Sequence, residues 1–204
     1  MTADCQAQIA AINRAASSEA LIGAVRSLAA QQSPAAIPKL IEVLGYNNPG
    51  AAVAAVDGLI QLGAIAVQPI LDTLDGYDYG ARAWASRALA KIGDPRALEN
   101  LLAAAQGDFA LSVRRAAAQG LGQLDWAQLP EAECQVGQQR VLTALLNAVQ
   151  DDEWVVRYAA IAGLQSLAQA APYLATSITA RLQQAATEDP DLAIQGDRAG
   201  PWSS

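Results

Sequence analysis

The sequence predicts an all-α fold, an α-solenoid in which short helical hairpins stack one on the next. Three observations predict it. Segments of similar texture recur along the chain, as AVAAVDGLIQLG, ARAWASRALAKIGD, VRRAAAQGLGQLD and VRYAAIAGLQSLA show. Leucine and alanine recur within them at spacings of three and four, which gives each helix one buried stripe. A single hairpin cannot bury that stripe alone, so the units must stack.

Each repeat unit is predicted to be a helix, a short polar turn and a second helix. The second helices are the segments just quoted, at 52–63, 81–94, 113–125 and 156–168, and when aligned they stand 30, 32 and 43 residues apart. The first helices precede them at 35–45, 66–76, 97–107 and 139–150. The turns between them read YNNPG, YDYG, DFALS and DDEW. Clear repeats therefore cover about 35–168.

The remaining segments extend this array to a single domain over residues 1–204. Residues 4–31 predict a degenerate first unit, best seen in EALIGAVRSLAAQ, and residues 173–195 predict a last unit whose second helix has decayed. The step of 43 residues requires an insertion, which DWAQLPEAECQVG at 125–137 supplies. A long loop between repeats is often a contact element, and we expect 125–137 to be such a loop.

Composition excludes several functional classes. The 204 residues are 52% hydrophobic and 16% charged, enough to bury a core. The net charge of −7 disfavours binding to nucleic acid, because a phosphate-binding protein needs a basic surface. No apolar run is long enough to cross a bilayer, and the N-terminus lacks the pattern of an export signal. We therefore expect a cytoplasmic protein in which Cys5 and Cys134 are reduced and unreactive.

Histidine is absent from the whole chain. Its absence removes the usual general base, the commonest metal ligand, and the Ser-His and Cys-His nucleophile arrangements. The carboxylates at 151–153 match no metal-binding loop and are typical of the start of a helix. Gly120 and Gly122 are interpreted as helix-packing glycines, and they do not form a phosphate-binding loop. The sequence therefore predicts no metal site and no nucleophile.

Arginine recurs at one position of the repeat, next to the start of the second helix. Arg82, Arg114 and Arg157 occupy it, whereas Ala52 replaces it in the earlier unit. We interpret these arginines as a structural ladder, because a guanidinium often bonds to a carboxylate between stacked elements. The predicted partners are turn carboxylates such as Asp78, Asp108 and Asp152.

Other repeat positions vary in ways that packing does not explain. Trp84 stands where each sister unit has alanine, and Arg87 stands where the others have Asp, Gln and Ala. Arg115 and Tyr158 share a third position, which the earlier units fill with valine and alanine. Residues of this kind share one face of the second helices. For each residue taken alone, an ordinary solvated helix face is the alternative interpretation.

Three further candidates, Tyr77, Asp78 and Tyr79, lie in the turn just before this variable face. Aromatic rings stack on a flat conjugated ligand, arginines pair with its carboxylates, and an aspartate accepts hydrogen bonds from its ring nitrogens. The combination therefore predicts a groove for a flat, conjugated, anionic molecule.

The repeat pattern VRxAAAxxLGxL resembles the HEAT-like repeat. Two more specific segments, GYNNPGAAVAAVDGLIQLG at 45–63 and YDYGARAWASRALAKIGD at 77–94, resemble the beta subunit of the heterodimeric phycocyanobilin lyase of cyanobacteria. The resemblance covers essentially the whole chain and implies an enzyme subunit that acts with a larger homologous alpha subunit. Together they would attach phycocyanobilin to a cysteine of the phycocyanin alpha subunit during phycobilisome assembly.

The resemblance also implies the chemistry. The acceptor thiol would add to the ethylidene group of the pigment's A ring and give a thioether, with phycocyanobilin as substrate and no further cofactor. Related lyase-isomerases carry a His-Cys motif near the turn that here reads Tyr77-Asp78-Tyr79. Because this chain has no histidine, we expect attachment without isomerisation.

On this interpretation, position and residue type assign a role to each candidate. Asp78 is predicted to bond the pyrrole nitrogens and favour the protonated, more electrophilic pigment, as the catalytic residue. Arg87 and Arg115 are predicted to hold the propionates. The predicted walls around the ring system are Tyr77, Tyr79, Trp84, Trp154 and Tyr158.

A different functional class fits the same repeats, namely a non-catalytic adaptor or chaperone that binds only proteins. The two are distinguished by adding phycocyanobilin, because an adaptor leaves the visible spectrum of the pigment unchanged. A HEAT-fold metal hydroxylase is disfavoured by the lack of histidine, and a HEAT-like DNA-repair glycosylase by the acidic charge.

Overall fold

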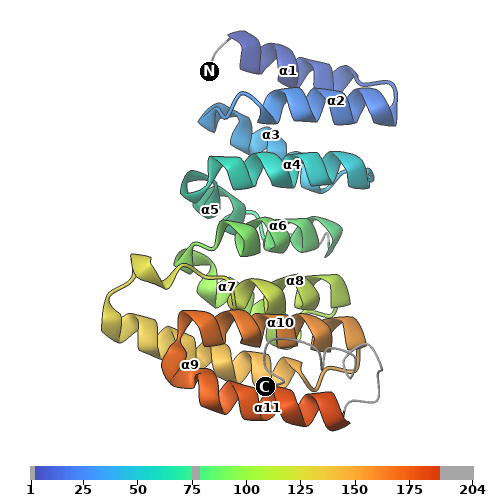
Figure 1. Cartoon of the computed structure of the whole chain (residues 1–204). Helices are drawn as coiled ribbons and strands as arrows, with labels where there is room; N and C mark the ends of the chain where they lie inside the picture. Colours follow the sequence, from blue (N-terminus) through green and yellow to red (C-terminus); the bar gives the residue numbers. More distant parts are fainter. Residues whose placement is uncertain (1–2, 75–78, 189–204) are drawn as a thin grey trace. The chain divides into compact units, whose positions relative to one another are not determined.

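The computed structural model describes residues 3–74 and 79–188 (Figure 1). All regular secondary structure among these residues is helical. The chain divides into two compact units, Met1–Ala97 and Leu98–Ser204. Helical hairpins stack within each unit, which confirms the predicted all-α solenoid class. The single domain over 1–204 stays a prediction.

Unit 1 consists of α1 (Ala3–Arg14), α2 (Ser18–Ala29), α3 (Ile37–Leu44), α4 (Pro49–Leu62), α5 (Ala64–Leu71) and α6 (Tyr79–Ile92), with short 3-10 turns η1 (Pro34–Ala36) and η2 (Pro95–Ala97). The second helices α2, α4 and α6 pack side by side in one layer, and α3 packs against α5 in the other (Figure 1). The hairpin of α1 and α2 is the predicted first unit.

Local residue chemistry explains where α4 and α5 begin. The side chain of Asn48 accepts the Ala51 N–H at 3.0 Å and so caps α4, which starts with Pro49. Gly63 ends α4 with φ 64°, a backbone conformation that L side chains rarely adopt, so α5 follows at once. As a result α5 covers Ala64–Leu71, earlier than the predicted 66–76.

Unit 2 consists of α7 (Leu98–Gly107), α8 (Leu111–Leu121), α9 (Glu131–Ala148), α10 (Trp154–Ala170) and α11 (Ala175–Glu188), with 3-10 turns η3 (Trp126–Gln128) and η4 (Pro172–Leu174). Here α8 packs against α10, α7 packs against α9, and α11 packs against α10 (Figure 1). The last part of the predicted final unit, beyond 188, lies outside the described residues.

The helices α8 and α10 approach each other through glycine. A Cβ on Gly163 would lie 2.6 Å from the carbonyl oxygen of Ala118, and a Cβ on Gly122 would overlap the backbone of Gly163. No larger residue fits at this crossing without moving one helix. The predicted packing role is therefore confirmed for Gly122, which ends α8.

The segment 125–137 is folded, which corrects the expectation of a long loop. After η3 the chain enters α9 at Glu131, eight residues before the predicted 139–150 helix. The Trp126 ring packs on Gly137, where a Cβ would lie 2.6 Å from it. The thiol of Cys134 donates to the carbonyl oxygens of Trp126 at 3.0 Å and Leu129 at 3.3 Å. The insertion thus extends α9 at its N-terminal end, and the Trp126 ring packs on this added part of the helix.

The core of both units is built from leucine and alanine, as the sequence pattern predicts. The small residues expected at close helix contacts, Ala85, Ala117 and Ala160, are all buried. Fully buried leucines include Leu28, Leu40, Leu59, Leu89, Leu101, Leu121, Leu145 and Leu164. Within the described ranges, no helix combines the length and apolar character that crossing a membrane requires.

Candidate functional site

Trp84 and Arg87 contact each other on α6 in unit 1. The guanidinium carbon of Arg87 lies 5.6 Å from the centroid of the Trp84 ring, in a cation–π contact. Trp84 is half-buried, whereas Arg87 is exposed and open to an anionic group. The structure therefore brings together two of the predicted ligand-contacting residues.

Arg115, Trp154 and Tyr158 lie on the exposed faces of α8 and α10 in unit 2. Trp154 is 46% exposed and Tyr158 is 45% exposed, and a spacing of four residues puts them on one face of α10. Arg115 is exposed on α8, which packs against α10. These positions are exposed, as expected for residues that packing does not fix.

The remaining predicted site residues have no described side chain. Tyr77 and Asp78 lie outside the described residues, and Tyr79 is described only as the first residue of α6. The described candidates are divided between two units. A single groove lined by all of them, and the catalytic role of Asp78, therefore stay predictions.

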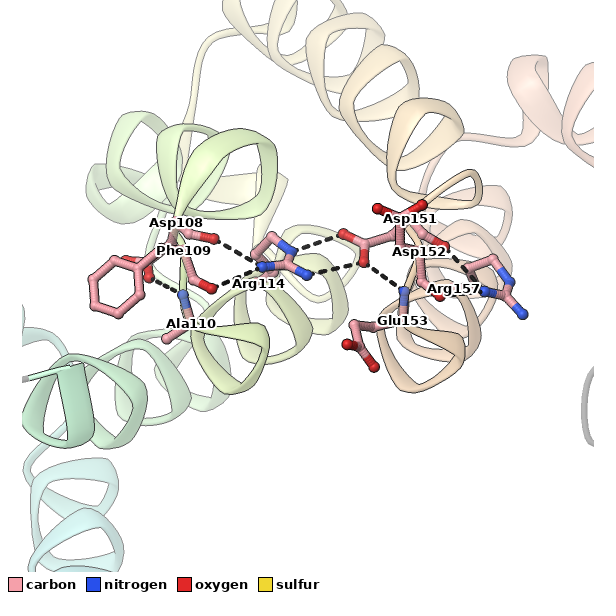
Figure 2. Close-up of polar contacts among 8 residues, drawn as sticks. All are labelled: Asp108, Phe109, Ala110, Arg114, Asp151, Asp152, Glu153 and Arg157. Carbon is pink, nitrogen blue, oxygen red and sulfur yellow. Dashed lines mark hydrogen bonds and ion pairs between the residues drawn. The ribbon is translucent and has the colours of Figure 1, made fainter.

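Arg114 connects two successive turns of unit 2 (Figure 2). Its guanidinium donates to both carboxylate oxygens of Asp151, from Nε at 2.7 Å and from Nη2 at 3.0 Å. Nη1 of the same group donates to the carbonyl oxygens of Asp108 at 3.0 Å and Phe109 at 3.2 Å. The predicted arginine–carboxylate pair is confirmed for Arg114, but the carboxylate is that of Asp151. Asp108 contributes its main-chain oxygen, while its carboxylate accepts the Ala110 N–H at 2.8 Å.

Arg157 repeats part of this arrangement in the next hairpin of unit 2. It is buried, and its Nη1 donates to the carbonyl oxygens of Asp151 at 3.0 Å and Asp152 at 3.1 Å (Figure 2). The main chain of the turn accepts these two bonds, and the expected contact to the Asp152 carboxylate stays a prediction. Asp78, the expected partner of Arg82, lies outside the described residues. The arginine position of the repeat thus ties down the turn that precedes it.

The ion pair changes the titration of both partners. The hydrogen bond from Arg114 lowers the pKa of the Asp151 carboxyl, against the opposing effect of burial, and the Glu153 N–H adds to the lowering. The bond to Asp151 likewise raises the pKa of Arg114. Both side chains are largely buried, so the pair is held in an environment where breaking it is costly.

Sequence reasoning missed two exposed apolar residues next to this pair. Phe109 is 75% exposed and Leu111 is 42% exposed. Phe109 is the chain's single phenylalanine, and the turns of the other units also carry an aromatic residue, namely Tyr46, Tyr77 and Tyr79, or Trp154. Aligning the turns as well as the helices would have shown this recurrence.

Sequence reasoning also missed a polar cluster of three side chains that stabilises the turn before α4. Lys39 Nζ lies 2.8 Å from both carboxylate oxygens of Glu42 and 3.3 Å from the Tyr46 hydroxyl, which itself donates to Glu42 at 2.6 Å. The Lys39 hydrogen bond lowers the pKa of Glu42. The spacing of three and seven residues puts these side chains on one face, a signal the sequence does contain.

The described side chains can bind and orient a ligand, and they offer no reactive group of their own. In the part of the chain that the structure describes, no three of His, Cys, Asp and Glu gather into a metal site. Cys5 and Cys134 are both buried. Aromatic surfaces and guanidinium groups remain, and these suit stacking and carboxylate binding.

Two family models match the chain. The model of HEAT repeats matches residues 52–122 and 67–165. The model of the PBS lyase HEAT-like repeat matches residues 20–46. The first of these covers more than half of the chain and agrees with the hairpin stacks of both units.

Curated relatives and a solved structure are similar over most of the chain. A protein of Synechocystis sp. named phycocyanin alpha phycocyanobilin lyase CpcF is 53% identical over 97% of this chain and 92% of its own length. A phycobilisome maturation protein of Synechococcus elongatus is 55% identical over 92% of this chain and 91% of its own. A chain in the solved complex of CpcE and CpcF of phycocyanin lyase from Nostoc sp. is 48% identical with a TM-score of 0.79, covering 84% of this chain and 100% of that one.

Proposed function

The chain belongs to the family of phycocyanobilin lyase beta subunits, and from this premise we propose that it acts as one subunit of a heterodimeric lyase. With a larger homologous subunit it attaches phycocyanobilin to a cysteine of the phycocyanin alpha subunit. The single observation that carries the proposal is the 53% identity to a named lyase over 97% of this chain. The solved complex of CpcE and CpcF, one chain of which is 48% identical to this chain, supports the heterodimer.

The proposed chemistry needs no nucleophile from this chain. The sulfur of the acceptor cysteine adds to the ethylidene carbon of the pigment's A ring, and the thiol proton ends on the pigment. One C–S bond forms, and nothing is oxidised or expelled. The lyase contributes placement, and well-oriented reactants gain at best about 7–11 kcal/mol from proximity. The side chains described at the candidate site are aromatic rings and guanidinium groups, which are not nucleophiles, and this supports the division of roles.

The proposed contacts follow residue type. Arg87 binds a propionate while its cation–π contact fixes it over Trp84, which stacks on a pyrrole ring. Unit 2 offers the same two kinds of contact: Arg115 can bind a propionate, and the rings of Trp154 and Tyr158 can stack on the pigment. Asp78 accepts from the pyrrole nitrogens and favours the protonated pigment.

The proposal includes three finer statements. The bond is a thioether, and the pigment is joined without isomerisation because no histidine is available to move a proton along its conjugated chain. Phycocyanobilin is the substrate, with no further cofactor. The reaction takes place in the cytoplasm during phycobilisome maturation, in line with the name of the Synechococcus relative.

The test is attachment in a defined mixture. This chain, the larger subunit, apo-phycocyanin alpha subunit and phycocyanobilin are combined, and the denatured acceptor band is examined by zinc fluorescence. We expect a fluorescent band whose absorbance is that of bound phycocyanobilin, and no band when this chain is omitted. A band of equal yield without this chain would identify it as a non-catalytic adaptor.

Two variants locate the site within the same assay. Asp78→Asn and Trp84→Ala are expected to lower the initial rate of attachment at least tenfold, the effect of losing about 1.4 kcal/mol of transition-state stabilisation. Ile65→Ser, on α5 of the same unit and exposed, is the control with an unchanged rate. If both site variants equal the control, the assigned residues are wrong while the lyase function stands.

A further inference from the structure

Four residues form an exposed edge where α8 begins and where the turn enters α10. They are Phe109, Leu111, Asp152 and Glu153, here called the turn edge. Phe109 and Leu111 present apolar surface, and Asp152 and Glu153 are exposed carboxylates on the turn that Arg114 joins to theirs. None of the four is used by the proposed pigment contacts.

The turn edge is fixed in place before anything binds to it. Arg114 bonds the carbonyl oxygens of Asp108 and Phe109 on one side and the carboxylate of Asp151 on the other. Asp151 in turn accepts the Glu153 N–H at 2.9 Å. Figure 2 shows the Phe109 ring and the Glu153 carboxylate both directed away from this network. An apolar side chain on an ordered turn loses little freedom on binding, which is typical of an interface anchor.

We propose that the turn edge docks the acceptor protein, through an apolar hollow on the acceptor that is rimmed by basic side chains. The charge of the edge supports a basic partner. The turn edge itself carries the Asp152 and Glu153 carboxylates, and next to it lie the Asp108 and Asp151 carboxylates and the Arg114 and Arg157 guanidinium groups. The local excess of negative charge repels the pigment's propionates and attracts lysine and arginine.

The position of the edge favours the acceptor over other proteins. Arg115 follows Leu111 by four residues, about 6 Å along a helix, and Trp154 directly follows Glu153. A protein held at the turn edge therefore has its surface next to the stripe where unit 2 offers pigment contacts. The reaction requires this adjacency, because the attacking sulfur belongs to the acceptor. The inference rests on the proposed function.

The experiment uses the heterodimer with apo-phycocyanin alpha subunit and phycocyanobilin. The test variants are the double change Phe109→Ser with Leu111→Ser, and the charge change Asp152→Asn with Glu153→Gln. The matched control is Val136→Ser, an apolar residue on α9 of the same unit that is 62% exposed. Three quantities are measured: the KM for the acceptor, the visible spectrum of pigment bound before acceptor is added, and co-purification with the larger subunit.

We expect the apolar double variant to raise the KM for the acceptor about tenfold, as loss of interface anchors does. The charge variant should raise it less and should also reduce its dependence on salt. The pigment spectrum and co-purification should match those of the control. An unchanged KM in both variants overturns the docking site, and so does lost co-purification, which would assign the edge to the larger subunit. A changed pigment spectrum would assign it to the pigment and overturns the proposal equally.

Failure of the docking site and failure of the proposed function give different results. If the unaltered heterodimer attaches no pigment, the lyase function fails. If it attaches pigment and the variants match the control, only the docking site fails. Binding of acceptor whose cysteine is replaced by alanine gives the same comparison without the chemical step.

Discussion

The turns before α4 and before α8 occupy the same place in the repeat but are tied to their neighbours by different chemistry. In the hairpin of α3 and α4, where Ala52 replaces the arginine, Asn48 Nδ2 donates to the Ser18 hydroxyl of the preceding hairpin at 2.8 Å. In unit 2, Arg114 pairs with Asp151 of the following hairpin. One connection is neutral and the other is an ion pair.

The difference shows that both turns are bonded to a neighbouring hairpin, but through different residues and different chemistry. A neutral amide–hydroxyl bond is worth about 1 kcal/mol and is insensitive to salt and to pH. A largely buried ion pair stabilises only while both partners are charged, and removal of one partner leaves a buried charge. The stability contributed by these two turns should therefore respond differently to mutation and to acid.

The largest expected effect is at Arg114. Arg114→Met should lower the free energy of unfolding by about 3 kcal/mol, because Asp151 is left buried without its partner and two turn carbonyls lose a donor. Urea unfolding followed by circular dichroism measures the loss, and hydrogen exchange assigns it to α8 and α10. Arg115→Met, an exposed neighbour on α8, is the control and should change stability by less than about 0.5 kcal/mol. Equal losses in the two variants would contradict the ion-pair account.

Acid should remove most of that difference. The pKa of Asp151 is lowered in the folded protein, so its contribution is present above the unfolded pKa of about 3.9 and is lost as pH falls through the folded value. The stability gap between the unaltered protein and Arg114→Met should therefore be full at pH 7 and shrink steadily below about pH 4. A gap that stays constant down to pH 2 would show that the carboxylate charge is not what Arg114 stabilises.

At Asn48 the expected loss is smaller. Asn48→Ala should cost about 1–2 kcal/mol, because it removes the α4 cap and the bond to Ser18 together. Asn48→Asp keeps the cap acceptor and should recover roughly half of the loss. Unlike the loss at Arg114, this one should be the same at 50 mM and 500 mM salt when measured by urea unfolding. A strong salt dependence would contradict the distinction between the two turns.

The smallest effect is expected at Tyr46. Tyr46→Phe removes the hydroxyl that bonds Glu42 and Lys39, and because Glu42 is half exposed the cost should be about 0.5 kcal/mol. Thermal unfolding detects this as a shift of about 1–2 °C in Tm. Ile65→Ser, an exposed substitution on α5, serves as the control. A loss above about 2 kcal/mol would mean that this cluster, and not Asn48, is the main tie of the turn.

Periodicity was sufficient to predict the fold class and most helix positions. The leucine and alanine stripes of α4, α6, α8 and α10 follow directly from burial of one helix face, and Ala85 and Ala117 are buried as expected. Periodicity does not predict the course of the chain within an insertion. Trp126 and Cys134 lie in a segment without repeats to align, so their packing onto the first turns of α9 was not predictable from pattern.

The candidate site was predictable in part for a similar reason. Comparing sister positions identified Trp84 and Arg87 as residues that packing does not require, and the structure shows their contact. The partner of Arg114 was not predictable, since choosing Asp151 over Asp108 depends on how far one hairpin advances past the next. Position in a repeat fixes which face a side chain occupies, and it does not fix which of two nearby carboxylates it reaches.

The burial of both cysteines has a consequence for a protein that handles a thiol-reactive pigment. In the proposed reaction the pigment is an electrophile toward sulfur, so an accessible thiol of the lyase beside the bound pigment would compete with the acceptor cysteine. Cys5 is 0% exposed, and the Cys134 sulfur is occupied by two carbonyl oxygens under the folded insertion. The lyase subunit is thereby protected from becoming its own acceptor, and each pigment molecule stays available for transfer.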